Sequence, residues 1–257
     1  MKTFYTLLIL LIPFVGFGQN VNIPDANFKA YLVGNTAINT NGDNEIQVSE
    51  ASAFNGHINC YNMNISDLTG VEFFTASTHL SCSENQLTSL DVSNNTALIY
   101  LDCNDNNITN LDLSQNTNLE SLGCYSNTLI TLDLSNNISL ELITAMHNDL
   151  VSLDVRNGNN INMGGMLYTY NNPNLSCVNV DDSSWSTNNW LAGDVGSNVY
   201  FSEDCPPLPP SAIQEHSTNK ELLKVTDLLG RETKGTKNEV VFYIYDDGTV
   251  EKRIIIE

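Results

Sequence analysis

A spacing of 21 residues runs through the middle of the chain and constrains its fold more than any other feature. Leu-Asp pairs recur at this step, and cysteine and asparagine recur in the same register. The recurring positions are Leu90, Leu111, Leu132 and Leu153; Cys82, Cys103 and Cys124; and Asn85, Asn106, Asn127 and Asn148. A fixed period of this length is typical of repeat proteins, in which each unit buries its apolar side against its neighbours. The sequence therefore predicts a solenoid, that is, a stack of similar coils.

One repeat unit, beginning at Leu98, reads L-x-x-L-x-C-x-x-N-x-I. This pattern resembles the leucine-rich repeat, whose consensus is L-x-x-L-x-L-x-x-N/C-x-L, and the resemblance covers residues 55–176. It implies a mostly β solenoid, a right-handed coil in which one short strand per unit joins a parallel, concave sheet. No helical period separates the strands, so we expect the convex side to consist of turns and short irregular pieces.

Alternate residues of each strand point inward, which predicts Leu101 and Cys103 in the core and Tyr100 and Asp102 on the outer face. Asn106 and its equivalents are expected to turn inward, where the side-chain amide can satisfy backbone N–H and C=O groups. The in-register cysteines, at positions 60, 82, 103 and 124, are expected as buried free thiols. Strands ~4.8 Å apart hold such side chains parallel rather than convergent, and a straight column cannot supply the tetrahedral ligands of zinc.

Both ends of an open stack need a cap, because the last coil otherwise exposes its core and its strand edge. Residues 19–54 are predicted to form the N-terminal cap. This cap begins with a short amphipathic helix, whose expected buried face is Ile23, Phe28, Tyr31 and Leu32.

Residues 39–50 match the spacing of the twelve-residue EF-hand loop, which holds calcium with oxygen ligands. The predicted calcium ligands are Asn39, Asn41, Asp43, Glu45, Gln47 and Glu50. The first ligand is asparagine rather than aspartate, and Asn44 stands where glycine normally makes the turn. With so few charged ligands the expected affinity is weak, ~10⁻⁴–10⁻³ M. The alternative is a metal-free helix–turn–helix cap.

Residues 177–205 are predicted to form the C-terminal cap. Cys177 leaves the repeat register, and in an exported protein this favours a disulfide between Cys177 and Cys205. Such a bridge would stabilise the fold by roughly 3–4 kcal/mol. We expect Trp185 and Trp190 to close the open end of the core.

Residues 1–18 have the organisation of an export signal, in which Lys2 precedes an apolar run and a cleavage site expected before Gln19. The run is too short to span a bilayer, which needs about 20 residues. We therefore expect an exported chain with no transmembrane span. The combination of the C-terminal cap, the calcium-like loop and the cysteine-bearing repeats resembles the secreted leucine-rich repeat proteins of Bacteroidetes-type bacteria.

The last part of the chain is predicted to be a proline-rich linker, residues 206–218, followed by a small, separate β domain, residues 219–257. Its clearest strands are expected at 240–245 and 250–256, joined by a hairpin turn at 246–248.

The Leu-Gly-Arg-Glu segment at 229–232 and the closing strand resemble the C-terminal sorting domain of the type IX secretion system. That resemblance implies contact with the type IX secretion machinery and export through the periplasm. The product is then released or attached to the outer cell surface. The alternative is an ordinary C-terminal β module.

The charges are unevenly distributed along the chain. Residues 19–218 contain Lys29 and Arg156 against 22 carboxylates, whereas residues 219–257 contain seven bases and eight acids. The large negative charge of residues 19–218 repels phosphate backbones and anionic lipid headgroups. This argues against binding to nucleic acid or to a membrane surface.

The outward strand positions form columns rich in tyrosine, which is favoured as an interface anchor, as is methionine. The candidate ligand-binding residues are His57, Tyr61, His79, Tyr100, Asp102, Asn104, Tyr125, Met146, Tyr168 and Tyr170. The alternatives are that these aromatic residues only stiffen the sheet, or that the two histidines hold a transition metal.

Catalytic signatures do not favour an enzyme. The sequence contains no G-x-S-x-G, H-E-x-x-H or phosphate-binding loop, and an aspartate that recurs in every repeat is more simply explained as scaffold. We therefore expect a secreted or surface-displayed, non-enzymatic binding or adhesion protein for a protein or glycan ligand, with calcium as the one candidate cofactor. The rival hypothesis is a hydrolase or accessory module that acts on surface polysaccharide or protein.

Overall fold

The computed structural model describes residues 18–164 and 166–206, and the three strands 222–226, 240–245 and 250–254. It divides into two compact units, one ending at Pro207 and one beginning at Leu208, and each is described by itself. The predicted export signal up to residue 17, most of the proline-rich linker and the Leu-Gly-Arg-Glu segment lie outside the described residues.

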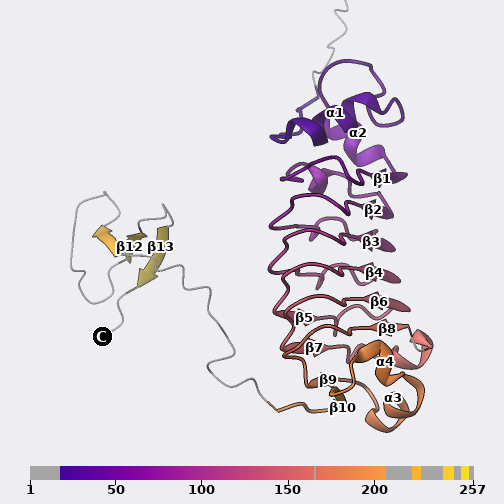
Figure 1. Cartoon of the computed structure of the whole chain (residues 1–257). Coiled ribbons are helices and arrows are strands. Elements are labelled where there is room, and N and C mark those ends of the chain that lie inside the picture. Colours follow the sequence, from indigo (N-terminus) through magenta and orange to yellow (C-terminus); the bar gives the residue numbers. More distant parts are fainter. Residues whose placement is uncertain (1–17, 165, 207–221, 227–239, 246–249, 255–257) are drawn as a thin grey trace, which may run out of the picture. The chain divides into compact units, whose positions relative to one another are not determined.

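The first unit is a stack of coils that begins with two short helices, α1 (Ala26–Gly34) and α2 (Val48–Ala53) (Figure 1). Asp25 caps α1, because its Oδ1 accepts hydrogen bonds from the backbone N–H groups of Asn27 and Phe28. The helix therefore begins at residue 26, and the prediction that Ile23 is part of it is wrong, although Ile23 is buried.

The predicted inner side of α1 is otherwise confirmed. Phe28 and Leu32 are fully buried. Tyr31 is half-buried, and its hydroxyl accepts a hydrogen bond of 2.8 Å from the backbone N–H of Asn59. The helix thus joins the cap to the first coil through both apolar packing and a hydrogen bond.

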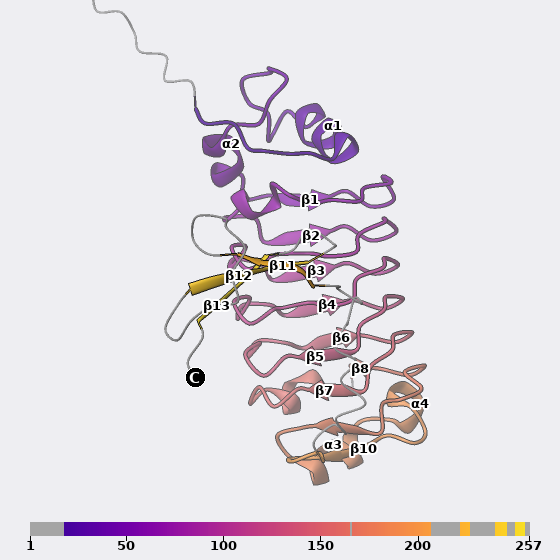
Figure 2. The ribbon, with the colours of Figure 1, turned by 90° about the vertical axis from the view of Figure 1, so that its left-hand side faces the viewer.

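Six short strands form the predicted parallel sheet, with one strand on each coil, and the coils lie one above another in both views (Figures 1 and 2). The strands, in their order across the sheet, are β1 (His57–Asn59), β2 (His79–Ser81), β3 (Tyr100–Asp102), β4 (Ser121–Gly123), β6 (Leu142–Thr144) and β8 (Leu167–Tyr168). Their central residues are in register and buried: Ile58, Leu80, Leu101, Leu122, Ile143 and Leu167. The predicted stacking of like side chains is confirmed.

The opposite side of the coil differs from the prediction, because its later coils form a second parallel sheet. Its strands, in order, are β10 (Tyr200–Ser202), β9 (Cys177–Asn179), β7 (Ser152–Asp154) and β5 (Thr131–Asp133). Leu132 and Leu134 both point inward and are buried, which is the alternation of a strand. Coils held in register by the first sheet bring these segments close enough to pair. Two short 3-10 helices, Val71–Phe73 and Asn160–Met163, complete this side of the coil.

The predicted inward-turning asparagines form a buried ladder. The Nδ2 group of Asn106 donates to the carbonyl oxygens of Cys82, Cys103 and Asn104 at 3.0–3.1 Å, and its Oδ1 accepts from the N–H of Leu87 at 3.0 Å. Asn85, Asn127, Asn148 and Asn172 make equivalent bonds. Each of these side chains therefore ties a coil to the one before it.

A second asparagine ladder, which the sequence analysis missed, runs along the other side of the coil. The Nδ2 group of Asn116 donates to the carbonyl oxygens of Val92 and Asn95, both at 3.0 Å, and Asn137 repeats the pattern one coil later. Asn95, Asn116 and Asn137 are spaced by the same 21 residues as the first ladder, so the signal was present in the sequence. The expectation that this side consists only of turns and irregular pieces concealed it.

The four in-register cysteines, Cys60, Cys82, Cys103 and Cys124, are free and buried, as predicted. Burial raises the pKa of the Cys124 thiol to about 12 and that of Cys60 to about 12. The thiols are therefore neutral at physiological pH and pack as small apolar groups.

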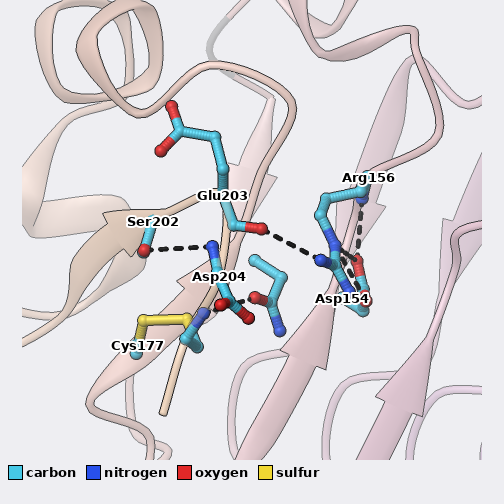
Figure 3. The surroundings of a disulfide bond; sticks show 8 residues. Asp154, Arg156, Cys177, Ser202, Glu203 and Asp204 are labelled. Atoms are coloured by element: carbon cyan, nitrogen blue, oxygen red, sulfur yellow. Dashed lines mark hydrogen bonds and ion pairs between the residues drawn. A yellow bond between two sulfur atoms is a disulfide. The ribbon is translucent and has the colours of Figure 1, made fainter.

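The C-terminal cap contains α3 (Ser183–Asn189) and α4 (Ala192–Val195). The predicted disulfide between Cys177 and Cys205 is present, with 5.9 Å between the two Cα atoms (Figure 3). Trp190 is 4% exposed and packs edge-to-face on Trp185 and Phe201. Trp190 therefore closes the core as expected, whereas Trp185 is only half-buried.

Beside the disulfide, Arg156 forms an ion pair with Asp154 of β7 and donates to the carbonyl oxygen of Glu203 at 2.9 Å (Figure 3). The N–H of Cys205 donates to the Oδ1 of Asn179 at 2.8 Å. Hydrogen bonds and the disulfide thus tie the end of this unit to its last coils.

The second unit contains a three-stranded antiparallel sheet, in the order β11 (Leu222–Thr226), β12 (Val240–Tyr245) and β13 (Val250–Ile254). The strand predicted at 240–245 is confirmed, and the one predicted at 250–256 is confirmed as far as Ile254. Residues 255–256 and the predicted turn at 246–248 lie outside the described residues. Among the helices that the structure describes, none has the length and apolar character needed to cross a membrane.

Candidate binding face

The outward side of the sheet β1-β2-β3-β4-β6-β8 is the candidate site, and we call it the six-stranded face. Strand register places the candidate residues in columns. One column contains His57, His79, Tyr100, Ser121 and Leu142, and a second contains Asn59, Ser81, Asp102, Gly123, Thr144 and Tyr168. The columns predicted from the repeat are therefore confirmed.

A third column lies just beyond the carboxyl ends of the strands. It contains Tyr61, Ser83, Asn104, Tyr125, Met146 and Tyr170, and backbone hydrogen bonds of 3.0–3.2 Å continue the ladder at this level. One outward position differs from expectation. Ser83 is only 5% exposed, because its Oγ donates to the Oδ2 of Asp102 at 2.9 Å. This hydroxyl supports Asp102 rather than a ligand.

The first column begins with three stacked rings. The imidazoles of His57 and His79 are stacked with 3.8 Å between ring centroids, and Tyr100 stacks on His79 at 5.7 Å. Desolvation and the neighbouring His57 lower the pKa of His79 below its ordinary value. The rings thus form a continuous aromatic edge, and within the part of the chain that the structure describes no cluster of three metal-ligating side chains occurs around them.

Carboxylates surround the two tyrosines of the third column. A hydrogen bond to Glu84 raises the pKa of Tyr61, and one to Asp105 raises that of Tyr125 to about 12. The negative charge of Asp102 contributes to both shifts. Each phenol therefore stays protonated and can donate its hydrogen to a carboxylate.

Asp102 is held in place by its neighbours. Its Oδ2 accepts from the hydroxyls of Ser83 at 2.9 Å and Ser81 at 3.4 Å, and its Oδ1 accepts from the N–H of Asn104 at 3.3 Å. These partners fix the direction in which the carboxylate points.

Glu84, Asp105 and His147 belong to this site and were missed as candidates. Each occupies the position before a ladder asparagine and has a left-handed backbone, with φ of 52°, 50° and 54°. In the sequence they stand directly before Asn85, Asn106 and Asn148. That position could have identified them, because the asparagine turns inward only if the residue before it bends the chain.

The C-terminal end of the face adds a second aromatic group. His147 packs edge-to-face on Tyr170 with 5.6 Å between ring centroids, and the amide of Asn171 lies 3.2 Å from its Nε2. Tyr170 and Asn171 also line an open cavity of about 770 Å³ beside the C-terminal cap, together with Pro173 and Val199.

The six residues predicted to bind calcium lie in one loop, where hydrogen bonds occupy most of their oxygens. The Oε1 of Glu50 accepts from the N–H groups of Thr40 and Asn41 at 2.7 and 3.2 Å, and its Oε2 accepts from the N–H of Gln47 at 3.0 Å. Although desolvation raises the pKa of Glu50, these hydrogen bonds outweigh it and hold the pKa below its ordinary value.

The remaining predicted calcium ligands are likewise engaged. The Oδ2 of Asp43 accepts from the amides of Asn41 and Gln47, both at 3.0 Å. The amide of Asn39 donates to the carbonyl oxygen of Asp43 at 2.7 Å. Glu45 forms an ion pair of 2.8 Å with Lys29 of α1. A calcium ion would have to exchange several of these contacts for its own.

Comparison with known proteins supports the leucine-rich repeat fold. No protein-family model matches the chain, and no curated protein matches it. Among solved structures, the functional domain of InlJ from Listeria monocytogenes is 31% identical, with a TM-score of 0.50, covering 63% of this chain and 38% of that domain. The internalins InlF and InlC2 of the same species are 18% and 16% identical, with TM-scores of 0.42 and 0.39 and 73% of this chain covered in each. They cover 59% and 89% of those two chains, respectively.

The fold and its internal ladders define a leucine-rich repeat protein. Within that class the chain is similar to the functional domain of InlJ, and it spans 38% of the length of that domain. That domain is described as including a cysteine ladder, and this chain has four in-register buried cysteines.

Proposed function

We propose that this protein is a secreted or cell-surface binding or adhesion protein, without enzymatic activity, that binds a protein or glycan ligand on its six-stranded face. The observation that carries the proposal is the contrast between the face and its support. Half-exposed tyrosines and histidines stand in columns on strands whose inward residues are almost fully buried. Such a rigid support lowers the ordering cost of binding.

The size of the face limits the kind of complex. Six strands ~4.8 Å apart and five residues at ~3.3 Å each give a projected area of very roughly 450 Å². A standard protein interface buries about 800 Å² per partner. The face therefore suits a weak contact that gains strength when many copies are displayed together.

Export and display belong to the same proposal. The export signal at residues 1–18 and the sorting-domain resemblance at residues 219–257 support a route through the periplasm and the type IX secretion machinery. Deletion of residues 220–257 should retain the protein in the periplasm, which fractionation and immunoblotting would detect. Unchanged secretion of the truncated chain would contradict this route.

A binding array tests the function itself. The mature chain, residues 19–257, would be applied to arrays of surface glycans and extracellular proteins. The wild type should bind a defined subset, and Tyr61→Ala with Tyr125→Ala should reduce that signal at least tenfold. Thr131→Ala with Ser152→Ala, on the second sheet, is the matched control and should leave it unchanged. Equal loss in both variants would reject the six-stranded face as the site.

We also propose weak calcium binding at the loop 39–50, supported by the EF-hand spacing and by the gathering of Asn39, Asn41, Asp43, Gln47 and Glu50 in one hydrogen-bonded loop. Isothermal titration should give a dissociation constant of ~10⁻⁴–10⁻³ M, and Glu50→Gln should weaken it. Absence of heat at millimolar calcium would reject the site.

A further inference from the structure

Two tyrosines of the six-stranded face flank a gap. Tyr61 and Tyr125 are the first and fourth members of the third column, with Ser83 and Asn104 between them. Neighbouring coils are ~4.8 Å apart, so the two tyrosines stand roughly 14 Å apart along the column. Tyr61 is 48% exposed and Tyr125 is half-buried. The two rings thus border a space in which smaller side chains form the floor.

Each tyrosine has a carboxylate on the neighbouring coil toward the gap. Glu84, on the coil after that of Tyr61, raises the pKa of Tyr61, and Asp105, on the coil before that of Tyr125, raises the pKa of Tyr125 to about 12. Glu84 and Asp105 lie on adjacent coils at equivalent left-handed positions, with φ of 52° and 50°. The N–H of Glu84 donates to the carbonyl oxygen of Asn104 at 3.0 Å, which fixes the two coils beside one another.

The side chains that form the floor of the gap are small and are held in place by hydrogen bonds. The Oδ1 of Asn104 accepts from the N–H of Tyr125 at 2.8 Å, so the amide lies along the sheet. It covers Gly123, where an added Cβ would come within 2.9 Å of the Nδ2 of Asn104. The hydroxyl of Ser83 is turned to Asp102. No large side chain from these residues projects between the two rings.

Within residues 18–206, no lysine or arginine compensates the charge of the gap. Glu84, Asp102 and Asp105 all influence the two tyrosines. Within residues 19–206 the lysine and arginine side chains are Lys29 and Arg156, and these are ion-paired with Glu45 and Asp154 away from this face. Aromatic ring faces beside carboxylates are the surroundings that a guanidinium or ammonium group prefers.

We propose that the gap bordered by Tyr61 and Tyr125 docks a basic, extended segment of a partner protein, whose lysine or arginine side chain lies between the rings and against Glu84, Asp102 and Asp105. This inference rests on the proposed binding function and narrows its ligand from protein or glycan to a cationic polypeptide. A neutral glycan would leave three carboxylates without a counter-charge. An extended peptide rises ~3.3 Å per residue, so about four residues span the two rings.

The test uses a fluorescein-labelled peptide with the repeated sequence Gly-Gly-Arg-Gly and an otherwise identical peptide in which citrulline replaces arginine. Fluorescence anisotropy would be measured with the mature chain, residues 19–257, at low and physiological salt. The arginine peptide should bind at least tenfold more tightly than the citrulline peptide, and its affinity should fall as salt rises.

Matched variants distinguish binding of the arginine peptide at the gap from its general attraction to an acidic protein. Glu84→Gln with Asp105→Asn removes two charges at the gap, and Asp112→Asn with Asp133→Asn removes two charges on the opposite side of the coil. The first pair should weaken binding at least tenfold and the second less than twofold. Equal weakening by both pairs would overturn the proposal, because the attraction would then come from net charge. Thermal unfolding of each variant would verify that it is folded.

Tyr61→Leu with Tyr125→Leu gives an independent measurement, since it keeps every charge and removes the rings. Binding of the arginine peptide should fall at least fivefold. No binding of the arginine peptide by wild type would overturn this inference. If a glycan or another protein on the arrays still required the two tyrosines, the proposed function would stand without it.

Discussion

Carboxylates lie on both walls of the coil, and the two sets are held differently. Opposite the six-stranded face, Asp91 and Asp112 each accept a hydrogen bond of 2.9 Å from the backbone N–H two residues ahead, and Asp133 and Asp154 do the same at 2.9 and 3.0 Å. On the six-stranded face, Glu84 and Asp105 instead raise the pKa values of the neighbouring Tyr61 and Tyr125.

The difference follows the repeat. The first set recurs every 21 residues and closes a turn in each coil, whereas equivalents of Glu84 and Asp105 in later coils are Ser126 and His147. A residue that every coil needs recurs in every coil. A carboxylate that occurs in only some coils is not required by the coil and is free to serve a ligand, and this is why Glu84 and Asp105 mark the candidate site.

The largest expected change in stability distinguishes the two disulfide cysteines, which lie outside the repeat, from the cysteines that recur in it. Cys177→Ala with Cys205→Ala should lower the free energy of unfolding by roughly 3–4 kcal/mol, because the bridge closes a loop of 28 residues in the unfolded chain. Cys103→Ala, within the buried column, should cost about 1 kcal/mol. Urea denaturation measures both. A larger loss from Cys103→Ala would show that the column, rather than the cap, limits stability.

The next effect concerns the asparagine ladder. Asn106→Ala removes four hydrogen bonds and leaves the buried N–H of Leu87 without its acceptor, which should cost about 3 kcal/mol. The carbonyl oxygens of Cys82 and Cys103 keep the amides of Asn85 and Asn127 as donors. Asn107→Ala changes the exposed neighbour and should stay within about 0.5 kcal/mol. Chemical denaturation of the two variants gives the comparison, and similar midpoints would contradict a structural role for the ladder.

Acid should protonate the recurring aspartates and so remove the stability that their ionised forms contribute. Hydrogen bonds from Ser93 and Ser114 lower the pKa of Asp91 and of Asp112 below the ordinary 3.8. A depressed pKa in the folded state adds stability above pH 3.8, and that stability is lost as the pH falls through the folded values. Asp91→Asn with Asp112→Asn should therefore flatten the decline of the unfolding midpoint between about pH 5 and pH 2. An unchanged decline would contradict this assignment.

The smallest effect on stability should come from the floor of the six-stranded face. Gly123→Ala would push the amide of Asn104, because its new Cβ would lie 2.9 Å from Nδ2. A side-chain end can move, so the cost in stability should stay below about 1 kcal/mol. The loss of ligand affinity on the six-stranded face should exceed the loss of folding stability when both are expressed as free energies. Gly193→Ala, which meets nothing within 4 Å, is the control.

Much of the fold could be predicted because the same pattern of inward and outward residues recurs in several coils. Leu101, Leu122 and Ile143 occupy one inward position in successive coils, and any misreading of one coil is corrected by the next. The disulfide was predictable for the opposite reason, since Cys177 leaves the pattern. The start of α1 was misplaced because capping by Asp25 is a local geometry that apolar spacing does not reveal.

The candidate site was only partly predictable. Repeat register placed Tyr61, Tyr125 and Asp102 correctly on the outer face. It could not show that Glu84 and Asp105 turn toward the tyrosines, because both residues leave the strand in a left-handed conformation. The second sheet was missed as well, since its pairing depends on how closely adjacent coils approach.

By itself, the sequence determined the period of the coil, the inward ladders of leucine, cysteine and asparagine, and the strong negative charge of the repeat body, because these properties depend on spacing and composition alone. Only the tertiary structure decided which wall gains a second sheet and which carboxylates stand beside Tyr61 and Tyr125. Those contacts join residues about 20 positions apart in the chain, and their geometry exists only once the coils are stacked.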